Sequence, residues 1–451
     1  MQKQDNTPTK TRLRKNLNAD ALNAALRSAF GQVSDPRCQK DIKISLTDAL
    51  VSGFAMFQFK DPSLLAFNER CKDEYELDNL KKIYGIERVP AYSSMSDILD
   101  IVSPNDLRKA FLVPFRALQR GKALEQFQVL GDHYLIALDG TGSFSSTKIK
   151  SDSCQVKTNK KTGEKTYYQQ VLGSALIHPD HKEVVPLAPE MIVPRDGDTK
   201  NDCERNAAKR WLKTFREDHP YLKAIITEDA LSSNAPHIRD LQAHNLRYIL
   251  GVKPGDHEHL YAHVHSAFAQ GQMREITFTD PKDPKTTHIF HFINGVPLNK
   301  SNPDLLVNFV AQIEKGPQKN REFSWITDFE VTPENVWEIM RAGRSRWKIE
   351  NETFNTLKNQ GYHFEHNFGL GKKHLSEIYI NLMMLAFLVD QTQQIACPLF
   401  QAVLKKMRFK KYLWEKMRIF FRSYIVYSIT DIFNAILYGR GKVELRGLTF
   451  G

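Results

Sequence analysis

Three acidic residues at the ends of separate segments could act together on a phosphodiester. Asp139 and Asp229 each close an apolar run, and Glu350 lies in a segment with helical spacing. Mg²⁺ prefers oxygen ligands, and two such ions about 4 Å apart can activate an attacking oxygen and stabilise a departing one. The sequence therefore predicts a site for two Mg²⁺ ions, which Mn²⁺ could replace, formed by Asp139, Asp229 and Glu350.

Basic residues accompany the third acid. Arg346 precedes Glu350 by four residues, so on a helix the two side chains share a face and can pair. Lys358 lies two turns further on and could hold a DNA strand. Glu352 is the alternative third ligand, but its offset of six residues from Arg346 puts it on another face, so Glu350 is preferred.

The segments that carry the acids predict an α/β core. Three strands followed by alternating helices and strands is the order of the RNase H fold, in which acidic residues gather at the strand ends of the central sheet. Glu204, at the start of a helix, is interpreted here as a carboxylate favoured by the helix dipole. The predicted strands are 133–138, 166–177, 182–193, 222–228 and 247–253, and the predicted helices are 201–217 and 236–244.

The whole chain is expected to be an RNase H-like mixed sheet flanked by helices and interrupted by a β-rich insertion, with helical regions at both ends. The Glu-bearing helix is expected to run from near Thr332 through Glu350 to Lys358, with a break at Gly343. Six segments follow: a basic flexible tail (1–17), a helical N-terminal domain with a DNA-binding role (18–130), the first part of the core (131–253), the insertion (254–320), the second part of the core (321–390) and a helical basic C-terminal region (391–451).

Composition and charge narrow the class of protein. The 451 residues include 63 Lys plus Arg against 52 Asp plus Glu, a net charge of +11, which favours a polyanionic partner such as nucleic acid. The five cysteines form no CxxC pair, which fits a reduced, cytosolic compartment rather than a disulfide framework. The N-terminus lacks the apolar core of a signal peptide, and the apolar run 378–389 is too short to span a bilayer.

Two lysine-rich segments could contact phosphates. The loop after the first strand carries Lys148, Lys150, Lys157, Lys160, Lys161 and Lys165, and its ordinary alternative is a solvated hairpin loop. The run 405–414 mixes charges with aromatic residues and could grip DNA or face a partner subunit. In the simpler interpretation, its apolar residues pack a helix while its lysines stay in water.

These motifs resemble those of a known family. Asp139-Gly-Thr, Asp229-Ala-Leu and the segment Arg346-Trp-Lys-Ile-Glu350-Asn-Glu-Thr-Phe-Asn-Thr-Leu-Lys358, followed by Asn-Gln-Gly-Tyr-His, are similar to the DDE transposases of bacterial insertion sequences, close to insertion-sequence family four. The resemblance covers about residues 130–390. It departs from the family pattern in two places: Gly343 stands where the family has tyrosine, and seven residues rather than six separate Glu350 from Lys358.

The resemblance implies a cytoplasmic, nucleoid-associated enzyme of cut-and-paste DNA transposition that acts on double-stranded terminal repeats and target DNA as a homodimer. It implies Asp139, Asp229 and Glu350 as metal ligands, Arg346 and Lys358 as DNA contacts, and a hairpin intermediate. The extra residue turns Lys358 about 80° away from Glu350 on an ideal α-helix. Two alternatives stay open: a stand-alone nuclease of the same fold, and a DNA-binding relic without activity.

Overall fold

The computed structural model describes residues 15–38, 40, 42–192, 203–280, 283–317, 320–439 and 443–445. Most of the predicted basic tail, 1–17, therefore lies outside the described residues. The chain divides into two compact units. The first unit comprises Met1–Leu124, Ile149–Ser153 and Thr356–Gly451, and the second comprises Glu125–Lys148 and Cys154–Asn355.

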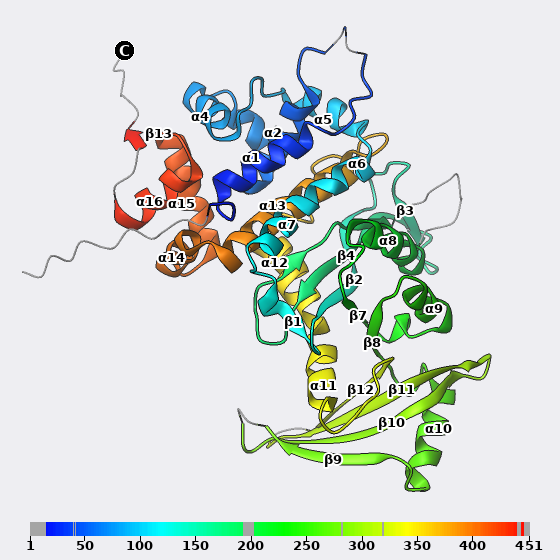
Figure 1. Ribbon diagram of the computed structural model, residues 1–451. Helices are drawn as coiled ribbons and strands as arrows, with labels where there is room; N and C mark the ends of the chain where they lie inside the picture. Colours follow the sequence, from blue (N-terminus) through cyan, green and yellow to red (C-terminus); the bar gives the residue numbers. More distant parts are fainter. Residues whose placement is uncertain are drawn as a thin grey trace, which may run out of the picture. The chain divides into compact units, whose positions relative to one another are not determined.

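The first unit is helical, as the sequence predicts for both ends of the chain. Its centre is α13 (Leu375–Ala396), whose residues 378–389 are all buried and which packs against α2, α5, α6 and α7 (Figure 1). The other elements are α1 (Ala19–Phe30), α2 (Leu46–Gln58), α3 (Leu64–Arg70), α4 (Glu74–Tyr84), α5 (Tyr92–Asp100), α6 (Pro104–Arg108), α7 (Leu112–Arg120), α14 (Pro398–Met407), α15 (Lys410–Ser423), α16 (Ile429–Tyr438) and the strand pair β13 (Tyr424–Val426) and β14 (Val443–Leu445).

A buried ion pair joins the early and late helices of this unit. The ammonium group of Lys60, just after α2, contacts the carboxylate of Asp390 on α13. The hydroxyl of Tyr362 donates to Asp390 Oδ2 at 2.5 Å, and Lys60 Nζ lies 3.9 Å from the centre of the Trp414 ring. Burial costs both charges their hydration, so the hydrogen bonds and the aromatic contact are needed to offset that cost.

No helix among the described residues is long and apolar enough to cross a membrane. All five cysteines are free thiols.

The second unit is built on one large mixed sheet flanked by helices (Figure 1). Its strand order is β3-β4-β2-β7-β8-β12-β11-β10-β9, with β2, β7 and β8 parallel to one another and the other neighbours antiparallel. The strands are β1 (Gln128–Val129), β2 (His133–Ser146), β3 (Gln155–Thr158), β4 (Lys165–Ile177), β5 (Val185–Pro186), β6 (Glu190–Ile192), β7 (Ala224–Glu228), β8 (Arg247–Gly251), β9 (Arg274–Thr279), β10 (Thr287–Asn299), β11 (Asn302–Lys315) and β12 (Asn320–Thr327).

Helical segments cover both faces of the sheet. Asp139 pairs with Gly173 across β2 and β4, so both lie on one face, and a Cβ at Gly173 would lie 2.5 Å from the Phe354 ring. Gly140 lies on the opposite face, against Glu204 of α8. The helical segments are α8 (Glu204–Asp218), α9 (Ala235–Ala243), α10 (Glu258–Ala269), α11 (Val336–Arg344), a 3₁₀ turn (Ser345–Trp347), a π-helical segment (Ile349–Phe354) and α12 (Asn355–Asn359).

The structure departs from the predicted elements in three places. The predicted strand 182–193 contains two short strands, β5 and β6, because Pro186 and Pro189 lack the N–H that a continuous ladder needs. The insertion 254–320 begins with α10, whose buried Leu260, Tyr261, Val264 and Ala267 have helical spacing. The predicted helix from near Thr332 to Lys358 is divided by the 3₁₀ and π-helical segments.

Gly173→Ala should destabilise the second unit. The new methyl group would meet the Phe354 ring at 2.5 Å, so the segment that carries Glu350 must shift away from β4. We expect a loss of about 1–3 kcal/mol in the free energy of unfolding, measured by urea denaturation. The matched control is Gly142→Ala on β2, where a Cβ has no neighbour within 4 Å; equal losses in the two variants would contradict the packing argument.

Candidate functional site

The parallel pairing of β2 and β7 brings two of the predicted acids together. Ala137 lies opposite Thr227 in the register of these strands. Asp139 and Asp229 are each two residues further along, at the same level of the sheet. Asp139 is half-buried in the middle of β2, two residues beyond the last pair of β2 with β7. Asp229 caps the short turn after β7 by accepting a hydrogen bond from Leu231 N at 3.0 Å.

Arg346 joins the third acid to the first. Its Nη1 donates to Asp139 Oδ2 at 3.0 Å, and its Nη2 lies 2.7 Å from Glu350 Oε1. The predicted pairing of Arg346 with Glu350 is therefore confirmed, although the residues between them are 3₁₀ and π-helical rather than α-helical. Because Phe354 packs against the sheet beside Asp139, the π-helical segment holds Glu350 over the same strand end.

A fourth carboxylate, on Glu204, lies beside these groups. A Cβ at Gly140 would lie 2.1 Å from Glu204 Oε1, so the absence of a side chain at 140 lets the start of α8 approach Asp139. Asp229 and Glu228 contribute to raising the pKa of Glu204, after burial, and Glu204 in turn acts on Asp139. The sequence interpretation as a helix-dipole carboxylate missed this placement.

A buried pair of side chains supports the Asp229 turn. His237 Nε2 lies 2.5 Å from Glu228 Oε2, and Ser232 Oγ donates to Glu228 Oε1 at 3.1 Å. Burial lowers the pKa of His237, but the Glu228 carboxylate outweighs it and raises that pKa above its ordinary value. The residue directly before Asp229 is thus fixed from two sides.

The charges at the site act strongly on one another. Burial, then Glu350 and Glu204, raise the pKa of Asp139 to about 7, against the opposing effect of Arg346. Burial lowers the pKa of Arg346, but Glu350, Asp139 and Asp229 together raise it. The guanidinium group is therefore the cation that balances the clustered carboxylates in this structure.

The donor set suits a hard divalent cation, because every candidate ligand is a carboxylate oxygen. Among the residues that the structure describes, however, no three His, Cys, Asp or Glu side chains are arranged as a metal site. Arg346 lies among the carboxylates and supplies positive charge there. The residue types fit the predicted ion, and its coordination stays a prediction.

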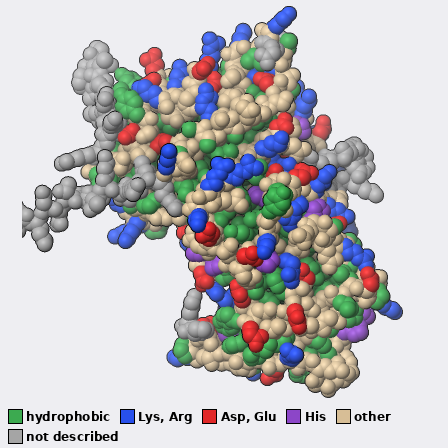
Figure 2. Space-filling model, viewed as in Figure 1, with side chains coloured by type: hydrophobic (Ala, Val, Ile, Leu, Met, Phe, Trp, Pro, Cys, Tyr) green, Lys and Arg blue, Asp and Glu red, His purple; other side chains and the backbone are tan. Residues whose placement is uncertain are grey.

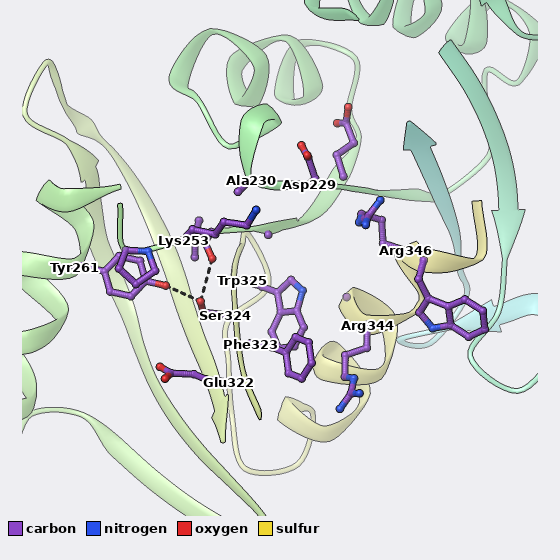
Figure 3. Close-up of a pocket in the computed structure, with 16 residues that line it drawn as sticks. Asp229, Ala230, Lys253, Tyr261, Glu322, Phe323, Ser324, Trp325, Arg344 and Arg346 are labelled. Atoms are coloured by element: carbon purple, nitrogen blue, oxygen red, sulfur yellow. Dashed lines mark hydrogen bonds between the residues drawn. The ribbon is translucent and has the colours of Figure 1, made fainter. Parts of the chain in front are cut away.

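A pocket of about 520 Å³ opens beside Asp229. Figure 3 shows Lys253 and Arg346 directed toward one another beside Asp229, with Trp325 and Phe323 on the adjoining wall. The two aromatic rings are stacked with their centres 6.1 Å apart, and the Arg344 guanidinium lies 4.3 Å from the Phe323 ring centre. Tyr261 and Ser324 hydroxyls lie 2.5 Å apart, and Ser324 donates to Val252 O, which ties β12 to the end of β8.

A second pocket, of about 480 Å³, lies on the Asp139 side. Glu228 and Asp229 line both pockets. The second is also lined by Asp139, Glu204, Arg205, Tyr168 and His237. Asp229 thus adjoins both pockets and Asp139 adjoins the second, whereas Glu350 is not among the residues that line either of them.

The remaining predicted site residues have other partners or surroundings in the structure. Glu352 acts on Lys348, whose ammonium group donates to His181 O, so Glu352 belongs to another group of contacts. Lys358 is in the first unit, where its Nζ lies 2.9 Å from Glu365 Oε1. Lys148, Lys150, Lys160 and Lys161 are exposed, the last two in the turn between β3 and β4.

Asp139→Asn should stabilise the metal-free protein at high pH. A carboxyl group with a folded-state pKa near 7 and an unfolded value near 3.8 keeps its proton only in the folded state, so its contribution to stability falls as the pH rises from about 4 to 7. The variant lacks this loss, so its free energy of unfolding should exceed that of the natural chain by on the order of 2 kcal/mol at pH 8. At pH 3.5 the two free energies should be equal. Urea denaturation in chelator measures both; a gain independent of pH would contradict the raised pKa.

Comparisons with known proteins leave the family open. No protein-family model matches the sequence, and no curated protein matches it. A solved structure of a piggyBac transposase in a synaptic complex with hairpin DNA is similar at 11% sequence identity, with a TM-score of 0.37, over 94% of this chain and 79% of that one. A likeness this weak assigns neither fold nor function.

Proposed function

We propose that this chain is a DDE-type DNA transposase, which cleaves DNA at the ends of a mobile element and joins the freed ends to a target. One observation carries the proposal: Asp139, Asp229 and Glu350, separated by 90 and 121 residues in the sequence, gather at one edge of the sheet, where all three act on Arg346. Three acids from separate elements are costly to hold together, and their repulsion has no evident benefit for the fold.

The order of strands supports the same class. Within the second unit, β4, β2, β7 and β8 are neighbours in that order, with β2 antiparallel to β4 and parallel to β7. This neighbour order supports the RNase H-like core that we propose for the second unit. The hairpin strands β9 to β11 lie between Asp229 and Glu350 in the chain, where insertion-sequence transposases have a β-rich insertion.

Asp139, Asp229 and Glu350 are the residues that would hold divalent cations. Two bound Mg²⁺ ions would lower the pKa of an attacking water or hydroxyl group and stabilise the negative charge of the departing oxygen. Arg346 fixes the orientation of the Asp139 and Glu350 carboxylates, and the Glu228–His237 pair fixes the chain before Asp229. Glu204 is suited to adjust the charge of the same cluster.

The reaction has two steps with the same chemistry. In the first, the oxygen of water bonds to the scissile phosphorus and the bond from phosphorus to the 3′ oxygen breaks. One proton of water goes to the departing 3′ oxygen and the other to solvent, so the products are a 3′ hydroxyl and a 5′ phosphate. In the second, the 3′ hydroxyl oxygen attacks a target phosphorus and displaces the target's 3′ oxygen, which takes up a proton. The number of phosphodiester bonds is unchanged in this second step.

The surroundings of the acids suit a large polyanionic substrate. The Glu350 side chain is 49% exposed, so a duplex can approach it without the opening of a closed cavity. Lys253, Arg344 and Arg346 supply positive charge in the adjoining pocket, and Phe323, Trp325 and Trp347 supply aromatic surface. Cations and aromatic rings together are the side chains that contact phosphates and bases. Two element ends must be joined, so we propose a homodimer in the DNA complex.

The test is incubation of the purified protein with the DNA that flanks its own gene, with and without Mg²⁺. We expect Mg²⁺-dependent nicks at the element ends. Asp139→Asn should lower the cleavage rate by at least about 10³-fold, because a ligand of the reacting centre is lost, while specific end binding stays within about threefold. Cleavage by Asp139→Asn at the natural rate would refute the assignment.

Glu352→Gln is the matched control for Glu350→Gln. Both remove one carboxylate from the same π-helical segment, but only Glu350 pairs with Arg346. We expect the Glu350 variant to be inactive and the Glu352 variant to cleave within about threefold of the natural rate. A strand-transfer assay with pre-cut ends then separates a transposase, which joins the ends to target DNA, from a nuclease, which only cuts.

A further inference from the structure

The last turn of α14, the short linker after it and α15 form the most basic stretch of the described chain. Residues 405–423 contain five lysines, three arginines and one acid, Glu415, so their net charge is 5 + 3 − 1 = +7 within a chain whose net charge is +11. Elsewhere the charges are mixed: Figure 2 shows Lys and Arg side chains interspersed with Asp and Glu over most of the visible face.

Some of these charges stabilise the unit: Lys406 and Arg418 donate to backbone carbonyl groups, and Lys405 stands in the last turn of α14, where a cation is favoured. The lysines at the start of α15 are not explained in this way. Lys410 and Lys411 stand in the first turn of α15, which contains no acid, and cations there oppose the positive end of the helix dipole. Within the described part of the chain, Lys405, Lys411 and Lys416 form no ion pair. A cluster of like charges that costs stability is better explained by a partner of opposite charge.

Aromatic side chains lie among these cations on the outside of the unit. Phe409 is 62% exposed and Tyr412 is 53% exposed, and their ring centres are 5.5 Å apart in an edge-to-face contact. Lys411, Tyr412, Glu415, Lys416 and Ile419 follow the spacing of one helix face, and all are exposed. The sequence expectation that the apolar residues of this run pack a helix is therefore right for Leu413 and Trp414, which are buried, and wrong for Phe409 and Tyr412.

We infer that this surface, defined by Lys405, Arg408, Phe409, Lys411, Tyr412 and Lys416, binds the phosphate backbone of duplex DNA. The choice of DNA among polyanions rests on the proposed function. The surface belongs to the first unit, whereas Asp139, Asp229 and Glu350 belong to the second. Four cations and two aromatic rings fit a backbone contact that positions DNA without reading its sequence.

Two other partners fit the surface less well. A second copy of the same surface would bring two strongly positive patches together, which repel each other. A membrane would need the apolar face of α15 to enter the lipid, but Leu413, Trp414, Met417 and Phe421 of that face are buried in the core of the unit. The large apolar side chains that stay exposed in this stretch are Phe409, Tyr412 and Ile419, which are too few for stable insertion into lipid.

The test measures how the affinity for a non-specific duplex depends on salt, in chelator so that no cleavage occurs. The variant Lys405→Gln/Lys411→Gln/Lys416→Gln should lower the slope of log K against log salt by about 2 to 3, because each phosphate contact contributes about 0.9. The control variant Lys81→Gln/Lys109→Gln/Lys122→Gln removes three exposed lysines elsewhere in the same unit and should change the slope by less than about 1. An unchanged slope in the first variant, or equal changes in both, would overturn the inference.

Further arms separate the competing partners. A loss confined to single-stranded DNA, a loss of binding to vesicles of anionic lipid with unaltered duplex binding, or a change in oligomeric state without DNA would each overturn the assignment to duplex. Thermal unfolding and circular dichroism show that both variants are folded. The result is independent of the proposed catalysis. If the natural chain cleaves DNA but the triple variant has an unaltered salt slope, only the assignment of this surface is refuted. If the triple variant has a lower slope but the natural chain never cleaves DNA, only the proposed transposase activity is refuted.

Discussion

The candidate site depends on one constraint of the fold: the second unit holds several carboxylates close together, although their charges repel one another. Asp139 and Asp229 stand at the same level because β2 and β7 run parallel, and Glu350 is held over that level because Phe354 fills the space left by Gly173. Burial, and after it repulsion by Glu350 and Glu204, raises the pKa of Asp139 to about 7. Arg346 offsets part of it by binding Asp139 and Glu350 at once.

This balance connects fold and function. A cluster of acids that retains unfavourable charge in the free protein gains more from a divalent cation than isolated surface acids would. The packing around the cluster is accordingly firm: Glu228 is held by His237 and Ser232, Glu204 contacts the bare backbone of Gly140, and Trp325 lies against Gly343. The last contact also leaves no room at position 343 for the tyrosine that is typical of insertion-sequence transposases.

The sequence predicted those parts of the site that depend on local pattern. An apolar run that ends in aspartate identified Asp139 and Asp229, and a four-residue offset identified the pairing of Arg346 with Glu350. The features it missed depend on contacts between distant residues. Glu204 approaches Asp139 only because α8 begins above Gly140, and no helical periodicity could show that.

The same distinction applies to the fold. The alternation of strands and helices between 133 and 251 could be predicted, but the pairing of β12 with β8, which extends the sheet into the insertion, joins segments some 75 residues apart. The π-helical segment could not be predicted for another reason, because π-helical turns are rare and occur mostly as single turns within α-helices. It overlaps the stretch between Glu350 and Lys358, which is one residue longer here than in the insertion-sequence transposases that the motif resembles.

The central claim is that Asp139, Asp229 and Glu350 together bind divalent cations. Anomalous diffraction from crystals of the protein soaked in Mn²⁺ tests it most directly. The account predicts a peak within coordinating distance of both Asp139 and Asp229, with the Arg346 guanidinium displaced from at least one carboxylate. Manganese bound only elsewhere, or none bound while the Arg346 contacts stay intact at saturating Mn²⁺, would contradict it.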